Sequence, residues 1–206
     1  MAFYYDSEPT TASDKKLISY RQNGINFDFY TDTDVFSRSE VDFGTNLMLE
    51  AMIEDVKSMD SRPERFLDLG CGYGVVGIVM KASFKSMSVT SVDRNSRAVK
   101  LTKENADYNR IPLSKVVASD VLSELSSDEM FDMVATNPPV RAGKQTVFAF
   151  YEQAYAHMNE GACIYVVLQR KQGAPSTMKK LEELFGNCET LAISGGYRVM
   201  KSVKGA

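Results

Sequence analysis

The stretch Phe-Leu-Asp-Leu-Gly-Cys-Gly-Tyr-Gly-Val-Val-Gly, residues 66–77, decides the fold. An apolar run leads into glycines at alternate positions, and an apolar pattern with helical period begins at Val75. This order predicts a buried strand, a tight turn and a helix start. Glycine tolerates a positive φ and, because it lacks Cβ, lets a ligand lie directly on the backbone. The turn is therefore predicted to seat a nucleotide-sized ligand.

Two classes of nucleotide-binding fold fit this turn. Gly72, Gly74 and Gly77 match the G-x-G-x-x-G fingerprint of dinucleotide-binding folds, with the acidic Asp93 about 20 residues further on. A dehydrogenase is one interpretation of that match, but the fingerprint alone is weak. Asp68 stands where the strand ends and its side chain can face the crevice. This carboxylate favours a different ligand.

The pattern Asp-x-Gly-x-Gly-x-Gly over residues 68–74 resembles motif I of the class I S-adenosylmethionine-dependent methyltransferases. The resemblance implies that the chain binds the amino-acid end of S-adenosylmethionine, with no pyrophosphate to cradle. The residues that would do so are Asp68, Gly70, Cys71, Gly72 and Gly74, unless Cys71 is simply a small, partly buried apolar side chain of the turn.

The composition is that of an ordinary globular protein. The chain has 206 residues, 44% of them hydrophobic and 25% charged, which predicts one domain with a sizeable core. No apolar run approaches the roughly 20 residues that cross a bilayer, and the N-terminus lacks a signal-peptide pattern, so we expect a cytoplasmic protein without a membrane partner. The three cysteines are far apart and form no C-x-x-C, which predicts neither disulfide nor metal site.

The charge is unevenly distributed. Residues 1–140 carry 15 Lys+Arg against 22 Asp+Glu, a net of −7, whereas residues 141–206 carry 9 against 5, a net of +4. Opposite signs in two parts of a chain hint at an anionic partner on one face. A solvated helix surface explains the excess equally well.

The N-terminal part predicts a hairpin and a helix. Residues 17–30 alternate apolar and polar around Asn23-Gly24, the dipeptide suited to a type I′ turn, so a small β-hairpin is expected outside the main sheet. Thr45 is the predicted N-cap of a helix. Its core-facing stripe is predicted to be Met48, Met52, Val56 and Met59.

From residue 66 onward the chain alternates strands and helices, as a parallel doubly wound sheet requires. Strands are predicted at residues 66–69, 88–92, 116–118, 131–136, 162–168, 190–193 and 197–200, and helices from Val75, at 96–105 and at 177–185. Carboxylates follow the second and third strands. Asp93 can accept hydrogen bonds from both ribose hydroxyls, and Asp120 can hold an adenine amino group, unless it is a simple turn aspartate. Their neighbours Arg94 and Val121 complete this predicted cofactor site.

Asn-Pro-Pro-Val at residues 137–140 is the strongest chemical signal. A residue before proline is held extended, and two prolines remove two backbone donors. The Asn137 amide oxygen and the Pro138 carbonyl then form a surface of acceptors, which suits an exocyclic amino group. Acceptors out of the ring plane draw an aromatic amine towards a tetrahedral geometry, so that its lone pair can point at a methyl donor. Rate would come from positioning and electrostatic complementarity, and the single histidine, His157, is given no role.

Asn-Pro-Pro followed by an apolar or aromatic residue resembles motif IV of the amino-methyltransferases. In many of them the fourth residue is an aromatic that stacks on the target, whereas here it is Val140. The wider pattern resembles the methyltransferase small domain of the ribosomal RNA small subunit methyltransferase C family, in its short, single-domain form. The stretches that carry the likeness are Val35-Phe-Ser, Asp42-x-Gly-Thr45, residues 68–74, residues 137–144, residues 169–176 and Gly196-Tyr-Arg-Val199.

This resemblance implies a class I methyltransferase, Rossmann-like α/β fold: a doubly wound, seven-stranded, mostly parallel sheet with an antiparallel last strand, plus the N-terminal hairpin. We expect a single domain over 1–206, with an extension at 1–41 and a catalytic core at 42–206. The implied catalytic residues are Asn137, Pro138, Pro139 and Val140, and Thr45 and Asn137 join the cofactor site. The implied substrate-binding residues are Phe36, Arg141, Lys144 and Arg170, the cations meeting RNA phosphates.

The predicted reaction is methyl transfer from S-adenosylmethionine to guanine N2 of 16S ribosomal RNA, by a monomer that meets ribosomal RNA or the small ribosomal subunit. DNA adenine N6 or a protein glutamine is an alternative target, although Val140 in place of an aromatic speaks against both. An RNA-binding or ribosome assembly module that retains the cofactor without turnover is a further alternative.

Overall fold

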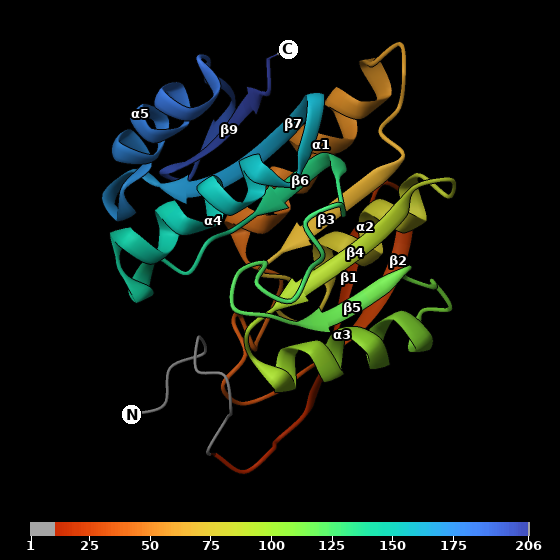
Figure 1. Ribbon diagram of the computed structural model, residues 1–206. Helices are drawn as coiled ribbons and strands as arrows, with labels where there is room; N and C mark the ends of the chain where they lie inside the picture. The colour runs from red at the N-terminus through yellow and green to blue at the C-terminus, as the bar shows by residue number, and fades with distance from the viewer. Residues whose placement is uncertain (1–10, 206) are drawn as a thin grey trace.

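The computed structural model describes residues 11–205, and its centre is a seven-stranded sheet with strand order β5-β4-β3-β6-β7-β9-β8 (Figure 1). All neighbouring strands are parallel except β9, which runs antiparallel to both β7 and β8. The predicted seven strands and the antiparallel last strand are therefore confirmed. The strands are β3 (Arg65–Leu69), β4 (Ser88–Asp93), β5 (Lys115–Ala118), β6 (Phe131–Thr136), β7 (Met158–Gln169), β8 (Glu189–Ser194) and β9 (Tyr197–Val203).

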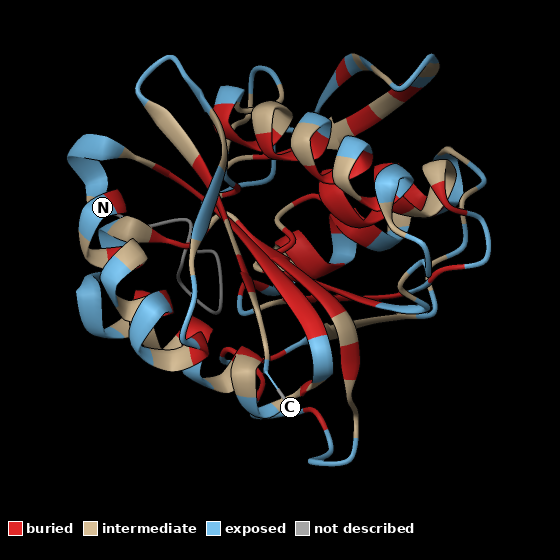
Figure 2. Cartoon of the chain, turned by 90° about the horizontal axis from the view of Figure 1, so that it is seen from above, coloured by how far each residue is buried: buried red, intermediate tan, exposed pale blue. Residues whose placement is uncertain are grey.

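Helices cover both faces of this sheet, as the alternating pattern requires. The buried side chains of α1 (Phe43–Ser58), α2 (Val75–Ser83) and α3 (Ser96–Tyr108) belong to one apolar cluster, and those of α4 (Lys144–Ala156) and α5 (Ala174–Phe185) to another. Figure 2 shows the central strands buried between these layers. Parallel strands that are buried on both faces are nearly continuous apolar runs. For this reason β3 and β6 could be predicted from the sequence.

The N-terminal hairpin forms a separate two-stranded sheet from β1 (Lys16–Gln22) and β2 (Ile25–Thr31). Asn23 and Gly24 both have positive φ, 49° and 76°, as a type I′ turn requires. The hairpin is fixed to α3 because Asn105 bonds both the N–H and the carbonyl of Tyr30, at 2.7 and 2.9 Å. The predicted hairpin outside the main sheet is thus confirmed.

Two helix starts differ from prediction. Helix α1 begins at Phe43, and its N-cap is Asp42, whose carboxylate accepts the Thr45 N–H at 3.0 Å. The prediction of Thr45 as the cap was wrong because the helix begins earlier: Asp42 accepts the N–H of Thr45, which places Thr45 inside the first turn. Helix α5 begins at Ala174 rather than 177, since Pro175 fits a first helical turn and Gly173, with φ +108°, precedes it.

The order of the strands indicates where a ligand would bind. The strand next to β3 on one side is β4 and on the other is β6, so the chain reverses its direction of sheet growth there. In open α/β sheets, ligands bind at the carboxyl ends of the strands beside such a switch point. The glycine turn after β3 and the Asn-Pro-Pro segment after β6 both lie at this edge.

Candidate active site

A cavity of about 410 Å³ opens at the carboxyl ends of β3, β4 and β6, within the usual range for small-molecule sites. It brings together the glycine turn, the Asn-Pro-Pro segment and the loop between β2 and α1. The predicted site residues that line it are Phe36, Thr45, Asp68, Gly70, Cys71, Gly72, Asp93, Arg94, Val121, Asn137, Pro138, Pro139, Val140 and Arg141.

Four predicted site residues lie outside the cavity wall. Gly74 is the left-handed residue before α2 and shapes the turn from behind. The Asp120 side chain is 60% exposed and stands 3.7 Å from the Arg94 guanidinium, although its neighbours Ser119 and Val121 line the cavity. Lys144 and Arg170 are exposed on the adjoining surface. The predicted roles of these residues stay predictions.

The backbone N–H groups of the glycine turn are hydrogen-bonded within the protein. Gly70 and Gly72 have φ values of +78° and +58°, and a Cβ on Gly72 would meet no atom within 4 Å, so that glycine leaves open space. The N–H groups of Gly70 and Cys71 donate to Val92 O at 2.8 and 2.9 Å. The Gly72 N–H donates to the Asp93 carboxylate at 2.9 Å. These backbone donors therefore hold the turn in shape.

Asp68 joins the end of β3 to the start of α2. Its side chain is buried, with 2% of the residue exposed, and accepts the Gly77 N–H at 2.8 Å. Burial raises the pKa of this carboxyl to about 7, against the lowering effect of that hydrogen bond, and the nearby Asp93 raises it further. A Cβ on Gly77 would lie 2.7 Å from Ser91 Oγ and 3.1 Å from Asp68 Oδ2, so Gly77 is needed for close packing.

Asp93 holds the glycine turn from the next strand. Besides the Gly72 N–H, it accepts the Asn95 N–H at 2.9 Å. Burial raises its pKa to about 6, against the lowering effect of these backbone hydrogen bonds. Asp93 therefore lines the cavity as an acceptor and also fixes its wall.

The cavity fits a cationic ligand better than a dinucleotide. A pyrophosphate needs free N–H donors at a glycine turn, but the N–H groups of Gly70, Cys71 and Gly72 are used within the protein. Asp68 and Asp93 add carboxylates to the same wall. S-adenosylmethionine carries an ammonium and a sulfonium, which suit such acceptors. The dehydrogenase interpretation is thereby disfavoured.

Asn137 is held by residues from the start of α1. Its amide nitrogen donates to Thr45 Oγ1 at 3.0 Å and to Asp42 Oδ2 at 3.2 Å. A carboxylate only accepts hydrogen bonds, so Asp42 selects the amide orientation in which nitrogen faces α1. The amide oxygen of Asn137 is left as the acceptor for a ligand in the cavity.

The Pro-Pro segment forms a tight turn. Pro139 has φ −74° and ψ 78°, close to an inverse γ-turn. The Val140 N–H donates to the Pro138 carbonyl at 2.8 Å. That carbonyl was predicted as the second acceptor. One of its two lone pairs is engaged locally, and the other is left for a ligand.

Sequence reasoning missed part of the cavity wall. Asp42 and Tyr197 both line it, and the Tyr197 hydroxyl lies 3.4 Å from Asp42 Oδ1. Phe150 of α4 lies behind the turn, where a Cβ on Gly70 would be 3.3 Å from its ring. Asp42 and Tyr197 stand within the stretches that carry the family likeness, which was the available signal. Phe150 had none.

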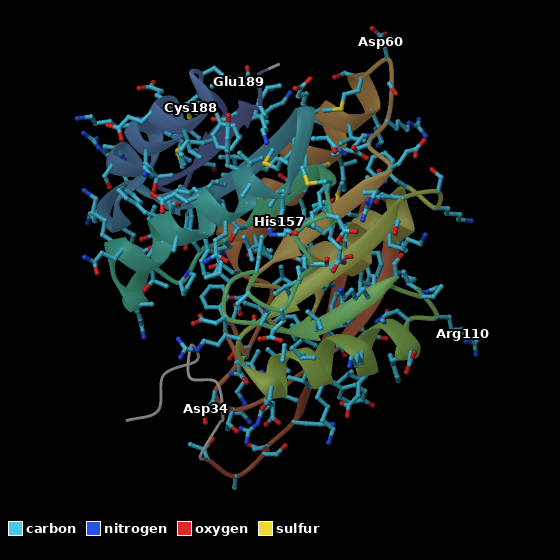
Figure 3. The ribbon with its side chains drawn as sticks, viewed as in Figure 1. Asp34, Asp60, Arg110, His157, Cys188 and Glu189 are labelled. Atoms are coloured by element: carbon cyan, nitrogen blue, oxygen red, sulfur yellow. The ribbon has the colours of Figure 1, made fainter. Side chains whose placement is uncertain are left out.

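Cys71 and His157 are the kinds of residue that often react in enzymes, but their surroundings here indicate a structural role. Cys71 is buried, its thiol lies 3.4 Å from Thr102 Oγ1, and burial holds its pKa well above the usual value. A thiol in that state is a poor nucleophile. His157, labelled in Figure 3, precedes β7 and therefore lies at the edge of the sheet opposite the cavity, with Nδ1 2.8 Å from Glu129 O.

No three His, Cys, Asp or Glu side chains within residues 11–205 come together as a metal site would require. No helix in the same range is both long enough and apolar enough to cross a bilayer.

A doubly wound sheet with a closing antiparallel strand and this cavity defines a class I S-adenosylmethionine-dependent methyltransferase. The chain belongs to the methyltransferase small domain family, whose model matches residues 26–201. Its cofactor is S-adenosylmethionine.

Similar proteins extend over most of the chain. An uncharacterized protein of Bacillus subtilis, YbxB, is 39% identical over 204 residues, 98% of each chain. Ribosomal RNA small subunit methyltransferase C of Haemophilus influenzae is 31% identical over 174 residues, 82% of this chain and 49% of that protein. The chain thus spans about half the length of these methyltransferase C relatives.

Solved structures show the same fold. The Thermus thermophilus 16S rRNA N2 G1207 methyltransferase RsmC, in complex with AdoMet and guanosine, matches with a TM-score of 0.84 at 27% identity, over 95% of this chain and 52% of that one. A ribosomal protein L11 methylase of Lactobacillus delbrueckii matches with a TM-score of 0.63 at 19% identity, over 81% of this chain and 85% of that one. The latter likeness concerns the fold alone, which does not determine the substrate.

Proposed function

We propose that this methyltransferase acts on an exocyclic base amine, and that its target is guanine N2 of 16S ribosomal RNA. The observation that carries the proposal is the orientation of Asn137, whose nitrogen is held by Thr45 and Asp42 so that its oxygen is left to accept an amine. The guanine N2 target is supported by the likeness to RsmC, whose solved structure contains AdoMet and guanosine.

The residues of the chain divide the work between binding and positioning. When bound, S-adenosylmethionine supplies an electrophilic methyl group on a good leaving group. Asn137 Oδ1 and the Pro138 carbonyl accept the two amine hydrogens, so that the nitrogen lone pair points into the cavity. After transfer the nitrogen carries a positive charge, and it releases one of these hydrogens to solvent as a proton. Pro139 and Val140 keep that turn rigid. The rate then comes from alignment and from acceptors matched to developing charge.

The proposed cofactor residues surround this point. Asp68 and the glycine turn face the cationic end of the cofactor, and Asp93 faces its ribose. We assign Val121 and Asp120 to the adenine end, although Asp120 must turn inward to reach it. The full proposed set is Thr45, Asp68, Gly70, Cys71, Gly72, Gly74, Asp93, Arg94, Asp120, Val121 and Asn137.

The proposed substrate residues lie at and beside the cavity mouth. Phe36 and Arg141 line the cavity, and Lys144 and Arg170 are exposed nearby. In the ion pairs formed within residues 11–205, Arg141, Lys144 and Arg170 take no part. Cations without carboxylate partners are available for phosphates. Because ribosomal RNA is its proposed partner, we place the working protein in the cytoplasm. We also propose that residues 1–206 act as a single domain and as a monomer.

The test is a transfer assay with labelled cofactor. Ribosomal RNA, small subunits, DNA and ribosomal protein are prepared from a strain that lacks the gene, and each is offered to the purified protein. We expect label in 16S RNA alone, mapped to guanine N2, and transfer slowed by about 10² to 10³-fold with Asn137→Ala. Label in DNA or protein instead would overturn the substrate. Cofactor binding without transfer to any fraction would favour the non-catalytic assembly module.

A further inference from the structure

A pair of aromatic rings leads from the cavity mouth onto the surface. Tyr197 lines the cavity, and the Phe43 ring lies against it with centroids 5.7 Å apart and planes at 43°. Phe43 is 51% exposed, which is high for a phenylalanine in a folded protein. The pair therefore presents an aromatic surface that continues the cavity wall outward.

Two glycines make room for this pair. A Cβ on Gly44 would lie 2.5 Å from the Tyr197 ring, and a Cβ on Gly195 would lie 2.8 Å from the Phe43 ring. Distances below 3.0 Å are not compatible with a real side chain. The backbone of α1 and of the β8–β9 turn therefore approaches the rings from behind, which fixes them while one ring stays half open to solvent.

Two basic residues follow β7, on a segment that is hydrogen-bonded to the β8–β9 turn. The Arg170 N–H donates to Gly196 O at 2.9 Å, so the segment after β7 is tied to the residue before Tyr197. Arg170 and Lys171 are both exposed, and neither joins an ion pair within residues 11–205. Proteins that bind single-stranded nucleic acid combine aromatic side chains with a positively charged surface, and the backbone here brings the two kinds of residue to adjoining segments.

We propose that Phe43 and Tyr197 form a stacking platform for the nucleotide next to the target in single-stranded RNA, with its phosphate met by Arg170 and Lys171. The proposal rests on the proposed function, since it takes the target base to enter the cavity beside Asn137.

The nature of the surface favours RNA over a protein partner. A protein-docking face needs a broad apolar patch with few charges at its centre. Here one half-exposed ring, Phe43, lies against Tyr197, and the exposed Arg170 and Lys171 belong to the segment that is hydrogen-bonded to Gly196. Bases extruded from RNA loops stack on aromatic side chains and place their phosphates on basic groups. The platform is therefore sized for one base.

The chain offers a clean probe because it contains no tryptophan. Phe43→Trp places a single indole on the platform, and Tyr108→Trp places one at a control site of matched exposure, 49%, on α3 outside the cavity. With a single-stranded oligoribonucleotide we expect quenching of the Phe43→Trp emission and no change for Tyr108→Trp. Equal responses, or none at position 43, would overturn the platform.

Affinity is measured in parallel by fluorescence anisotropy of a labelled oligoribonucleotide. Removing a stacked base contact weakens binding by roughly 5- to 100-fold, so we expect about tenfold loss for Phe43→Leu and near-native binding for Phe43→Tyr. Leucine keeps apolar packing against Gly195, and a thermal melt verifies the fold. Loss of binding in both variants, or in neither, would contradict a stacking role, as would preference for a peptide over RNA.

Neither readout requires methyl transfer, so the two proposals fail separately. RNA binding that depends on Phe43, together with label found only in DNA or protein, would keep the platform and overturn the substrate. Methylation of 16S RNA with unchanged RNA affinity in Phe43→Leu would keep the substrate and overturn the platform. A wild-type protein that binds no single-stranded RNA overturns the platform outright.

Discussion

The two sides of the cavity are built differently. On the β3–β4 side, the glycine turn is held by its own backbone and by Asp68 and Asp93, with bonds that span 9 and 21 residues of sequence. On the β6–β9 side, Asn137 is held by side chains 92 and 95 residues away, and Tyr197 meets Asp42 across 155 residues. The cofactor side is thus a local structure, whereas the substrate side exists only once α1 has packed against the sheet.

The largest effect is expected from removing the acceptor on the substrate side. Asn137→Ala deletes the amide oxygen that faces the amine, and the loss of one such positioned group lowers kcat by about 10² to 10³-fold. Cofactor affinity should fall by much less than kcat, because Asn137 is one member of the proposed cofactor set and the glycine turn, Asp68 and Asp93 are intact. Calorimetric titration with S-adenosylmethionine and a labelled transfer assay measure both. Comparable losses in the two assays would show that the sides do not act separately.

On the cofactor side, the expected effect is on stability and its pH dependence. Asp68 has its pKa raised to about 7, so between about pH 4 and 7 the unfolded chain releases this proton while the folded chain keeps it. Stability relative to Asp68→Asn should therefore fall as pH rises through that window, by about 4 kcal/mol, and level off above it. Asparagine can still accept the Gly77 N–H.

Denaturant unfolding of the cofactor-free protein at several pH values measures this difference. Asp93, with its pKa raised to about 6, titrates in the same direction in both proteins, so it largely cancels from the comparison. A difference that stays constant from pH 4 to 7 would mean that Asp68 is ionised in the folded state.

A smaller effect should come from the link between α1 and the substrate side. Asp42→Ser keeps an N-cap for α1 but removes the carboxylate that orients the Asn137 amide. We expect about a tenfold fall in kcat, as an order of magnitude for one misoriented group, with an unchanged melting temperature. Asp42→Ala should lose a further ~1 kcal/mol of stability from the missing cap. Full activity in Asp42→Ser would show that Thr45 suffices to orient Asn137.

The smallest effect is expected at the rim. Arg141→Ala should reduce the slope of log affinity for RNA against log salt by about 1, as the loss of one phosphate contact does. Lys103→Ala on the exposed face of α3 is the matched control and should leave the slope unchanged. Equal slopes for the wild type, Arg141→Ala and Lys103→Ala would show that Arg141 does not contact an RNA phosphate.

Prediction from the sequence was most accurate where the structure depends on neighbouring residues. The β3 run, the glycine turn and the Asn23-Gly24 hairpin were predicted with their correct geometry, because φ preferences and hydrophobic period act over a few residues. The start of α1 was predicted at the wrong residue, because Thr45 and Asp42 are both of a type that caps helices. Only the folded helix shows that the Asp42 carboxylate accepts a backbone N–H of the first turn, that of Thr45.

What the sequence by itself determined is the order of strands and helices and the position of the two motifs at strand ends. What only the tertiary structure decided is how Asn137 is turned, which residues stand behind Gly70, and that Phe43 and Tyr197 meet. The reason is physical: local preferences are written in adjacent residues, whereas a contact across 95 or 155 positions depends on how whole elements pack, and no local pattern encodes that packing.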